Sequence, residues 1–164
     1  MNPHNLYPFF NFGILAPWAL LVFAPRWRWT QTLIHGAVVP AALCFVHGAL
    51  CVALWGSMPP DAGGQSLSAV MRMFSVPWLA LLCWVHYLAF DLFVGAWVVR
   101  DAARRNLPRV MVAPCVVVIC FFGPVGLLLY LVVRFARCHT LALGEEAGAE
   151  ARRAAAAEGA SASA

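Results

Sequence analysis

A histidine and an aspartate interrupt one of the most apolar parts of this chain. The segment Trp84-Val-His-Tyr-Leu-Ala-Phe-Asp-Leu-Phe-Val-Gly95 contains His86 and Asp91, and Asp91 is the only charged residue between positions 77 and 99. A carboxylate near the middle of a membrane-spanning helix costs about 2.5–3.5 kcal/mol to insert. Such a residue usually faces protein or water, so Asp91 is a candidate functional residue.

These side chains could carry out acid–base chemistry. A carboxyl group in a low dielectric favours its neutral acid form, which can donate a proton, and a neutral imidazole can accept one. We therefore predict Asp91 and His86 as catalytic residues, although a helical wheel places them about 140° apart and facing different helices. Tyr87 lies one turn before Asp91 on the same face, with Trp84 and Gly95 nearby. Buried hydrogen bonds between helices are the alternative role for each polar group.

The composition indicates that these residues lie in a membrane. Hydrophobic residues make up 63% and charged residues 11% of the 164-residue chain, whereas globular proteins have about 25% charged residues. Four apolar segments are long enough to cross a bilayer, at about residues 6–24, 33–55, 77–99 and 110–133. The predicted fold is therefore an all-α membrane protein, a four-transmembrane-helix bundle.

The connections add one short helix and a tail. After a turn-rich linker at residues 59–64, the stretch 66–74 has apolar residues at helical spacing, with Ser66 as a possible N-cap. We predict a short interfacial helix between spans two and three. Residues 1–139 are expected to form a single membrane domain. Residues 140–164 are rich in Ala, Glu and Arg without an apolar stripe, and we predict a mobile tail.

The charge distribution argues against a nucleic-acid partner. The formal charge of +4 comes from eleven basic residues, all arginine, which are dispersed at the membrane boundaries and form no basic stripe. The first and third loops are the richest in arginine. By the positive-inside rule these loops should lie in the cytoplasm and, with four straight crossings, both termini should lie outside.

A helix break is expected in the fourth span. The run Phe122-Gly-Pro-Val-Gly126 contains Pro124, which cannot donate a helical backbone hydrogen bond and displaces the carbonyl one turn before it. Gly123 permits close approach of a neighbouring helix or a ligand. Small residues also serve helix packing in membranes, so both interpretations stay open.

Polar residues from several spans should lie at similar depth. With 1.5 Å per residue and alternating directions, His47, His86 and Pro124 fall within about 5 Å of the midplane, and Asn11 slightly further out. We therefore expect one cavity at this depth, lined by Asp91, His86 and the backbone near Pro124. The predicted substrate-binding residues are Asn11, Trp84, Tyr87, Gly95, Gly123 and Pro124.

These motifs resemble the plant neoxanthin-synthase family, also called the abscisic-acid-deficiency protein four family, and its bacterial relatives. The resemblance covers roughly residues 8–135 and includes Asn11…Pro17-Trp18…Pro25…Thr30, the segment 84–95, Arg100-Asp101-Ala102 and Phe122-Gly-Pro-Val-Gly-Leu-Leu-Leu-Tyr130. It implies a multi-pass membrane protein linked to conversion of violaxanthin to neoxanthin. That reaction is an isomerisation, which needs an acid for the epoxide oxygen and a base for a polyene proton. The Ala- and Arg-rich chain, without a plastid transit peptide, suggests a bacterial inner membrane.

Two other functions stay open at this point. The first is a non-catalytic membrane protein that binds a carotenoid or lipid. The second is a metal- or haem-binding protein, since His47, His86 and Asp91 have the composition of a two-histidine, one-carboxylate iron site. Cysteine spacing shows no metal or disulfide motif. We predict no metal and no cofactor, with membrane lipid and a hydrophobic small molecule as partners, and make no prediction of the oligomeric state.

Overall fold

The apolar segments fold into helices, as predicted. The computed structural model describes residues 2–140, which form eight helical elements and no strand. The predicted mobile tail, apart from Thr140, lies outside the described residues. Judged by length and composition alone, four helices could cross a membrane, which confirms the predicted all-α membrane class; they cover Pro3–Phe23, Arg28–Ala53, Pro77–Arg104 and Arg109–Cys138.

The first two of these are interrupted helices. Helices α1 (Pro3–Gly13) and α2 (Leu15–Phe23) meet at Ile14 and together make the first. The second consists of α3 (Arg28–Thr30), the π-helical turn η1 (Gln31–His35) and α4 (Val38–Ala53). Between η1 and α4 the chain turns through Ala37 at φ 61. The freed carbonyl of His35 accepts a hydrogen bond of 3.1 Å from Arg100, which ties this break to the next membrane helix.

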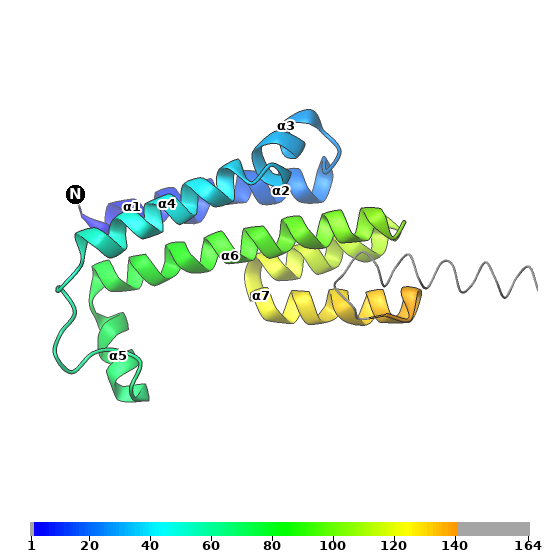
Figure 1. Ribbon diagram of the computed structural model, residues 1–164. Helices are drawn as coiled ribbons and strands as arrows, with labels where there is room; N and C mark the ends of the chain where they lie inside the picture. Colours follow the sequence, from blue (N-terminus) through cyan, green and yellow to red (C-terminus); the bar gives the residue numbers. More distant parts are fainter. Residues whose placement is uncertain (1, 141–164) are drawn as a thin grey trace, which may run out of the picture.

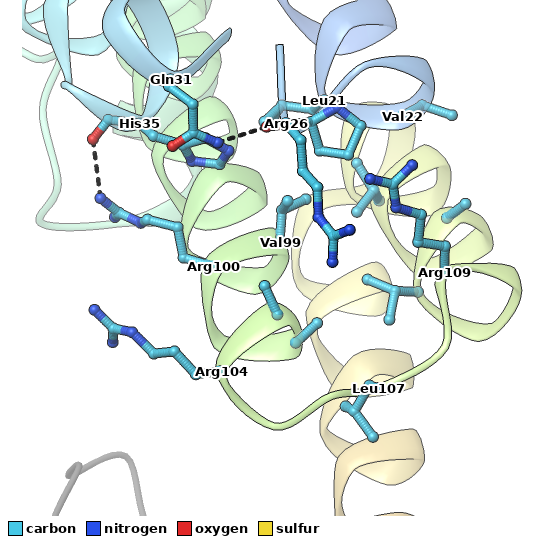
Figure 2. Close-up of a pocket in the computed structure, with 16 residues that line it drawn as sticks. Leu21, Val22, Arg26, Gln31, His35, Val99, Arg100, Arg104, Leu107 and Arg109 are labelled. Atoms are coloured by element: carbon cyan, nitrogen blue, oxygen red, sulfur yellow. Dashed lines mark hydrogen bonds between the residues drawn. The ribbon is translucent and has the colours of Figure 1, made fainter. Parts of the chain in front are cut away.

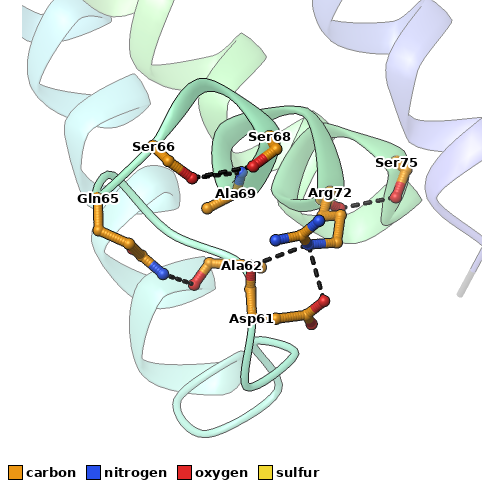
Figure 3. A network of polar contacts seen from close by, with 8 residues as sticks. All are labelled: Asp61, Ala62, Gln65, Ser66, Ser68, Ala69, Arg72 and Ser75. Carbon is orange, nitrogen blue, oxygen red and sulfur yellow. Dashed lines mark hydrogen bonds and ion pairs between the residues drawn. The ribbon is translucent and has the colours of Figure 1, made fainter.

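The short helix α5 (Leu67–Ser75) lies between the second and third membrane helices. Ser66 caps it as predicted, because its side chain accepts a hydrogen bond from the Ala69 N–H at 3.2 Å. Figure 3 shows how the linker is held: Arg72 donates to the Asp61 carbonyl at 2.9 Å and pairs with the Asp61 carboxylate at 2.8 Å. Its interfacial position stays a prediction, although an apolar face is left uncovered, formed by Leu67, Met71 and Phe74.

Helix α6 (Pro77–Arg104) is the centre of the fold. It begins with Pro77 at its first turn, where a missing N–H costs nothing. It contacts α1, α2, η1, α4, α5 and α7. In Figure 1 the first two membrane helices lie along one side of α6 and α7 lies along the other. Residues on opposite faces of α6 therefore have different helical neighbours.

Helix α7 (Arg109–Cys138) reverses its direction halfway. Its backbone leaves the helical conformation at Phe122 (φ −138, ψ 35) and Gly123 (φ 10, ψ −85), and Figure 1 shows two arms that run antiparallel to each other. The arms touch, because a Cβ on Gly126 would collide with the backbone of Ile119. Each arm rises about 20 Å, which is too short to cross a hydrocarbon core of about 30 Å.

The reversal corrects the path predicted for the fourth span. Residues 110–133 were expected to make one kinked crossing that leaves both termini on the same side. Instead α7 returns to the side on which it begins, and the N-terminus lies at the opposite end of the bundle (Figure 1). The expectation failed because Pro124 and its glycine neighbour produce a full turn of the chain, where a kink was predicted. As a result Arg134 and Arg137 lie on the same side as the first and third loops.

A buried charged cluster holds the second arm of α7 against the end of α6. Asp101 is 5% exposed and Arg134 is fully buried. The Asp101 Oδ2 accepts a hydrogen bond of 2.5 Å from the Tyr130 hydroxyl, and it lies 3.0 Å from Arg105 Nε and 3.2 Å from Arg134 Nε. The Arg134 guanidinium also lies 5.9 Å from the Trp97 ring centre. We call Asp101, Arg105, Tyr130 and Arg134 the Asp101 cluster.

The first prediction concerns the path of α7. In a variant whose six cysteines are replaced, Asn106→Cys in the third loop and Arg137→Cys at the end of α7 should react with a membrane-impermeant maleimide from the same side of sealed vesicles. Asp61→Cys, in the linker before α5, should react from the other side. Labelling of Arg137→Cys together with Asp61→Cys would instead mean that α7 crosses once.

The second prediction concerns the Asp101 cluster. Arg134→Gln removes a fully buried cation and leaves Asp101 partly uncompensated, so it should lower the free energy of unfolding by about 3–5 kcal/mol. Arg137→Gln, three residues later and exposed, should change it by about 0.5 kcal/mol or less. The double variant Asp101→Asn with Arg134→Gln should regain part of the loss, because no charge is left unpaired. Thermal unfolding in detergent measures all three, and equal stability of the two single variants would contradict a structural role for the cluster.

Candidate functional site

The tip of the α7 hairpin meets Asp91 near the middle of α6. Gly123 is buried there, and a Cβ added to it would lie 2.5 Å from Asp91 Oδ1 and 3.0 Å from Oδ2. Only glycine therefore lets the backbone of the tip approach the carboxyl group so closely. The Tyr87 hydroxyl, one turn earlier on α6, lies near the same carboxyl group and the Gly123 backbone. The structure thus brings together Asp91, Tyr87 and Gly123, and their role in a site stays a prediction.

Aromatic rings continue from this point towards the start of α6. Trp84 stacks on Tyr87 with ring centres 5.6 Å apart and planes at 23°. Tyr7 of α1 lies 5.5 Å from Trp84, ring centre to ring centre. All three line a cavity of about 610 Å³ between α1, the end of α5 and the start of α6, which we call the aromatic cavity. Its other lining residues are Pro3, His4, Phe74, Ser75, Pro77, Ala80, Leu81 and Cys83.

The hairpin explains why this cavity exists. Because α7 turns back at Asp91, it covers only the second half of α6, and the first half is left to α1, α4 and α5 (Figure 1). Tyr87 belongs both to the cavity wall and to the contact with Asp91. Tyr87 is therefore the side chain that connects the inner end of the aromatic cavity with the Asp91 carboxyl group.

Two buried polar atoms on this face of α6 are unsatisfied. Asp91 Oδ2 and Trp84 Nε1 are buried and have no hydrogen-bond partner among residues 2–140. Buried polar atoms in proteins are almost always hydrogen-bonded, so each exception needs an explanation. A carboxyl oxygen and an indole N–H could bind the polar groups of an otherwise apolar ligand.

His86 lies on a different face of α6. It is exposed on the protein surface, and its ring centre is 5.1 Å from that of His47 on α4. His47 in turn has Nδ1 at 3.2 Å from the Leu82 carbonyl and Nε2 at 3.5 Å from Cys51 Sγ. The structure keeps His86 apart from Asp91, in agreement with the angle of about 140° between them on the helical wheel. The expectation that both line one cavity is therefore wrong.

The remaining predicted substrate residues are dispersed. Gly95 is buried under Trp18 of α2, since a Cβ on it would lie 2.6 Å from the indole ring. Pro124 is exposed just beyond the tip, and Asn11 is half-buried on α1. Their contribution to a substrate site stays a prediction. Tyr7, which the sequence analysis missed, enters the site because α1 packs against α6.

The iron-site alternative is not assembled by the fold. His47 and His86 are neighbours, but Asp91 faces the α7 tip on the other side of α6. Among the residues described, no group of three or more His, Cys, Asp or Glu side chains could hold a metal ion.

Comparison with known proteins identifies the family of the chain. The model of the ABA4-like family, described as ABA DEFICIENT 4-like, matches residues 5–130. The match covers all four membrane helices up to Tyr130 in the second arm of α7. No curated protein and no solved structure matches the chain.

The third prediction concerns the contact between the hairpin tip and Asp91. Gly123→Ala places a methyl group against the carboxyl oxygens and should lower the stability by about 1–3 kcal/mol, as overpacking does. Gly48→Ala is a matched control, because a Cβ at this α4 position meets nothing within 4 Å and alanine favours a helix. Thermal unfolding of the two purified variants measures the difference. If Gly123→Ala is as stable as Gly48→Ala, the tip does not rest on Asp91.

Proposed function

Because the chain belongs to the ABA DEFICIENT 4-like family, we propose that it acts on a carotenoid or related isoprenoid lipid within a bacterial inner membrane. The observation that carries this proposal is the aromatic cavity, whose inner end leads through Tyr87 to a carboxyl group at mid-depth. Ligand pockets typically combine apolar and aromatic walls with a few polar groups. This cavity has that composition and lies where a lipid-soluble substrate would enter from the bilayer.

The cavity suits one cyclic end group of a long substrate. Its lining ends at Tyr87, one turn before Asp91 and less than halfway along α6, so it cannot contain a molecule as long as the bilayer is thick. The polyene would extend along the surface of α1 and α6, where exposed apolar side chains face lipid. Trp84 Nε1, which has no partner among the described residues, could donate a hydrogen bond to a ring hydroxyl of a xanthophyll.

The proposed reaction is the acid–base isomerisation of an epoxide, as in neoxanthin synthesis. Neutral Asp91 donates its proton to the epoxide oxygen while the carbon–oxygen bond breaks and a hydroxyl group forms. The resulting carboxylate then removes a proton from the adjacent polyene carbon, and the electrons of that C–H bond form the new double bond of the allene. The proton count of Asp91 is restored, and no oxidant or reductant is needed.

Tyr87 and His86 receive different roles in this scheme. The Tyr87 hydroxyl lies beside the carboxyl group, where it could hold the substrate oxygen and stabilise its developing charge. His86 faces α4 and His47, so we do not assign it the base. Asp91 alone acts first as acid and then as base.

A second candidate function uses the same cavity without chemistry. The stacked rings of Tyr7, Trp84 and Tyr87 would also favour simple binding of a polyene, since aromatic faces pack well against conjugated chains. Pigment analysis separates the two functions. A changed carotenoid profile in cells that express the protein supports catalysis, whereas co-purified pigment with an unchanged profile supports binding.

The fourth prediction tests the acid–base role in a bacterial host that makes an epoxy-carotenoid. Asp91→Asn keeps the shape of the side chain but removes its titratable proton, so product formation should fall by about 10²–10⁴. The protein should still accumulate, because a neutral amide is no costlier to bury than a carboxylate. Tyr87→Phe should reduce product by a smaller factor, and His86→Gln by less than Tyr87→Phe. Product is quantified by chromatography of cell extracts and normalised to protein in the membrane.

Asp61→Asn is the matched control for this experiment. It makes the same chemical change at an exposed linker carboxylate and should leave product unchanged. Wild-type yield from Asp91→Asn would end the acid–base proposal. A loss as large in His86→Gln as in Asp91→Asn would show that Asp91 does not act alone.

A further inference from the structure

A second cavity lies at the other end of the bundle from the aromatic cavity. It has a volume of about 230 Å³ and is formed between the first loop, the end of α6 and the start of α7. Four arginines line it, Arg26, Arg100, Arg104 and Arg109; in Figure 2 the side chains of Arg100 and Arg104 extend away from those of Arg26 and Arg109. We call this cavity the arginine pocket. Its apolar wall contains Leu21, Val22, Val99, Val112 and Val116.

The arginines come from three separate elements. Arg26 follows α2, Arg100 and Arg104 end α6, and Arg109 begins α7. In Figure 2 the side chains of Arg26 and Arg109 converge on the same part of the pocket. Arg100 is oriented by its 3.1 Å hydrogen bond to the His35 carbonyl. Two residues distant in sequence, Arg26 and Arg109, thus place their guanidinium groups at one small space.

Among the described residues, no carboxylate lines the pocket beside Arg26 and Arg109. The lining residues include neither Asp nor Glu. Of the three acidic residues in the described part of the chain, Asp61 pairs with Arg72 and Asp91 meets the hairpin tip. Asp101 is enclosed in its own cluster with Tyr130, Arg105 and Arg134. Within the described residues, like charges gathered in this way favour an anionic ligand.

The position of the pocket indicates what else the ligand carries. Trp27, in the same loop as Arg26, and Trp29, in the adjoining helix α3, are both exposed, and such residues are enriched where a membrane meets water. The guanidinium groups are therefore expected at the level of the lipid headgroups, and the apolar wall of the pocket extends towards the hydrocarbon region. This arrangement matches a molecule with a charged head and an apolar tail. Arginine binds phosphate oxygens in a fixed bidentate geometry.

We propose that the arginine pocket binds a phosphate group, with Arg26 and Arg109 as its principal ligands. A membrane phospholipid supplies this chemistry, and so does a soluble diphosphate. The site is separate from the reaction proposed at Asp91, since it lies at the end of α6, whereas Asp91 lies near the middle of that helix.

The experiment uses the full chain in nanodiscs. One set contains phosphatidylcholine alone, one contains phosphatidylcholine with phosphatidic acid, and one contains phosphatidylcholine with inorganic pyrophosphate added to the buffer. Native mass spectrometry counts the phosphatidic acid that stays bound, and thermal unfolding measures stabilisation in each set. We expect retained phosphatidic acid and a higher melting temperature for the wild-type protein in the second set. Stabilisation in the third set instead would assign the pocket to a soluble diphosphate.

Variants separate a pocket from general surface attraction. Arg26→Gln and Arg109→Gln should each weaken binding about tenfold or more, as the loss of a charge-assisted hydrogen bond does. Arg28→Gln is the matched control: Arg28 begins α3 two residues after Arg26, is exposed as Arg26 is, and lies 5.1 Å from the Trp29 ring centre, but does not line the pocket. Arg26→Lys keeps the charge without the bidentate geometry and should give an intermediate loss, even if a glutamine variant fails to fold.

Three results would overturn the proposal. The first is equal weakening by Arg28→Gln, Arg26→Gln and Arg109→Gln, which would mean attraction by surface charge alone. The second is wild-type affinity in Arg26→Lys and in both glutamine variants. The third is the same stability of the wild-type protein in all three nanodisc sets.

Discussion

The structure depends on the pairing of the α7 hairpin with α6 through the Asp101 cluster. Arg134 can reach Asp101 only if α7 has turned back, because Asp101 lies near the loop from which α7 starts. A buried ion pair is not by itself strongly stabilising, but breaking one is costly because it leaves an uncompensated charge. The cluster also excludes a straight α7, which would place Arg134 on the opposite side from Asp101 and leave that carboxylate with Arg105 alone.

The same hairpin forms both cavities. Its tip stops at Asp91 and leaves the first half of α6 to the aromatic cavity, whereas its first arm supplies Val112, Val116 and Arg109 to the arginine pocket. One end of the protein is therefore aromatic and nearly uncharged, and the other carries most of the arginines. α6 joins them, with Asp91 and Asp101 ten residues apart on the same helix. The first lies in the candidate site and the second fixes the fold around it.

Much of the fold could be predicted from the sequence, because the length of an apolar segment and the spacing of its apolar residues depend only on neighbouring residues in the chain. The lengths of the apolar segments correctly predicted four helices of membrane-spanning length, and Ser66 was correctly identified as an N-cap. The reversal at Phe122 and Gly123 could not be predicted, since a proline beside a glycine fits a kink as well as a turn. What decides between them is the distant pair of Asp101 and Arg134. Likewise the helical wheel correctly placed His86 and Asp91 on different faces of α6. The contact of Gly123 with Asp91 could not be predicted without knowing the path of α7.

The hairpin also changes the balance of charge across the membrane. With a straight α7, Arg134 and Arg137 would oppose the arginines of the first and third loops. In the observed fold all of them lie on one side, and Arg72, paired with Asp61, is the arginine of the other side among the described residues. The positive-inside rule then assigns the arginine-rich side to the cytoplasm. On this rule we expect the start of α6 in the outer half of the bilayer, a substrate of the aromatic cavity to enter from the outer leaflet, and the arginine pocket to face the headgroups of the inner leaflet.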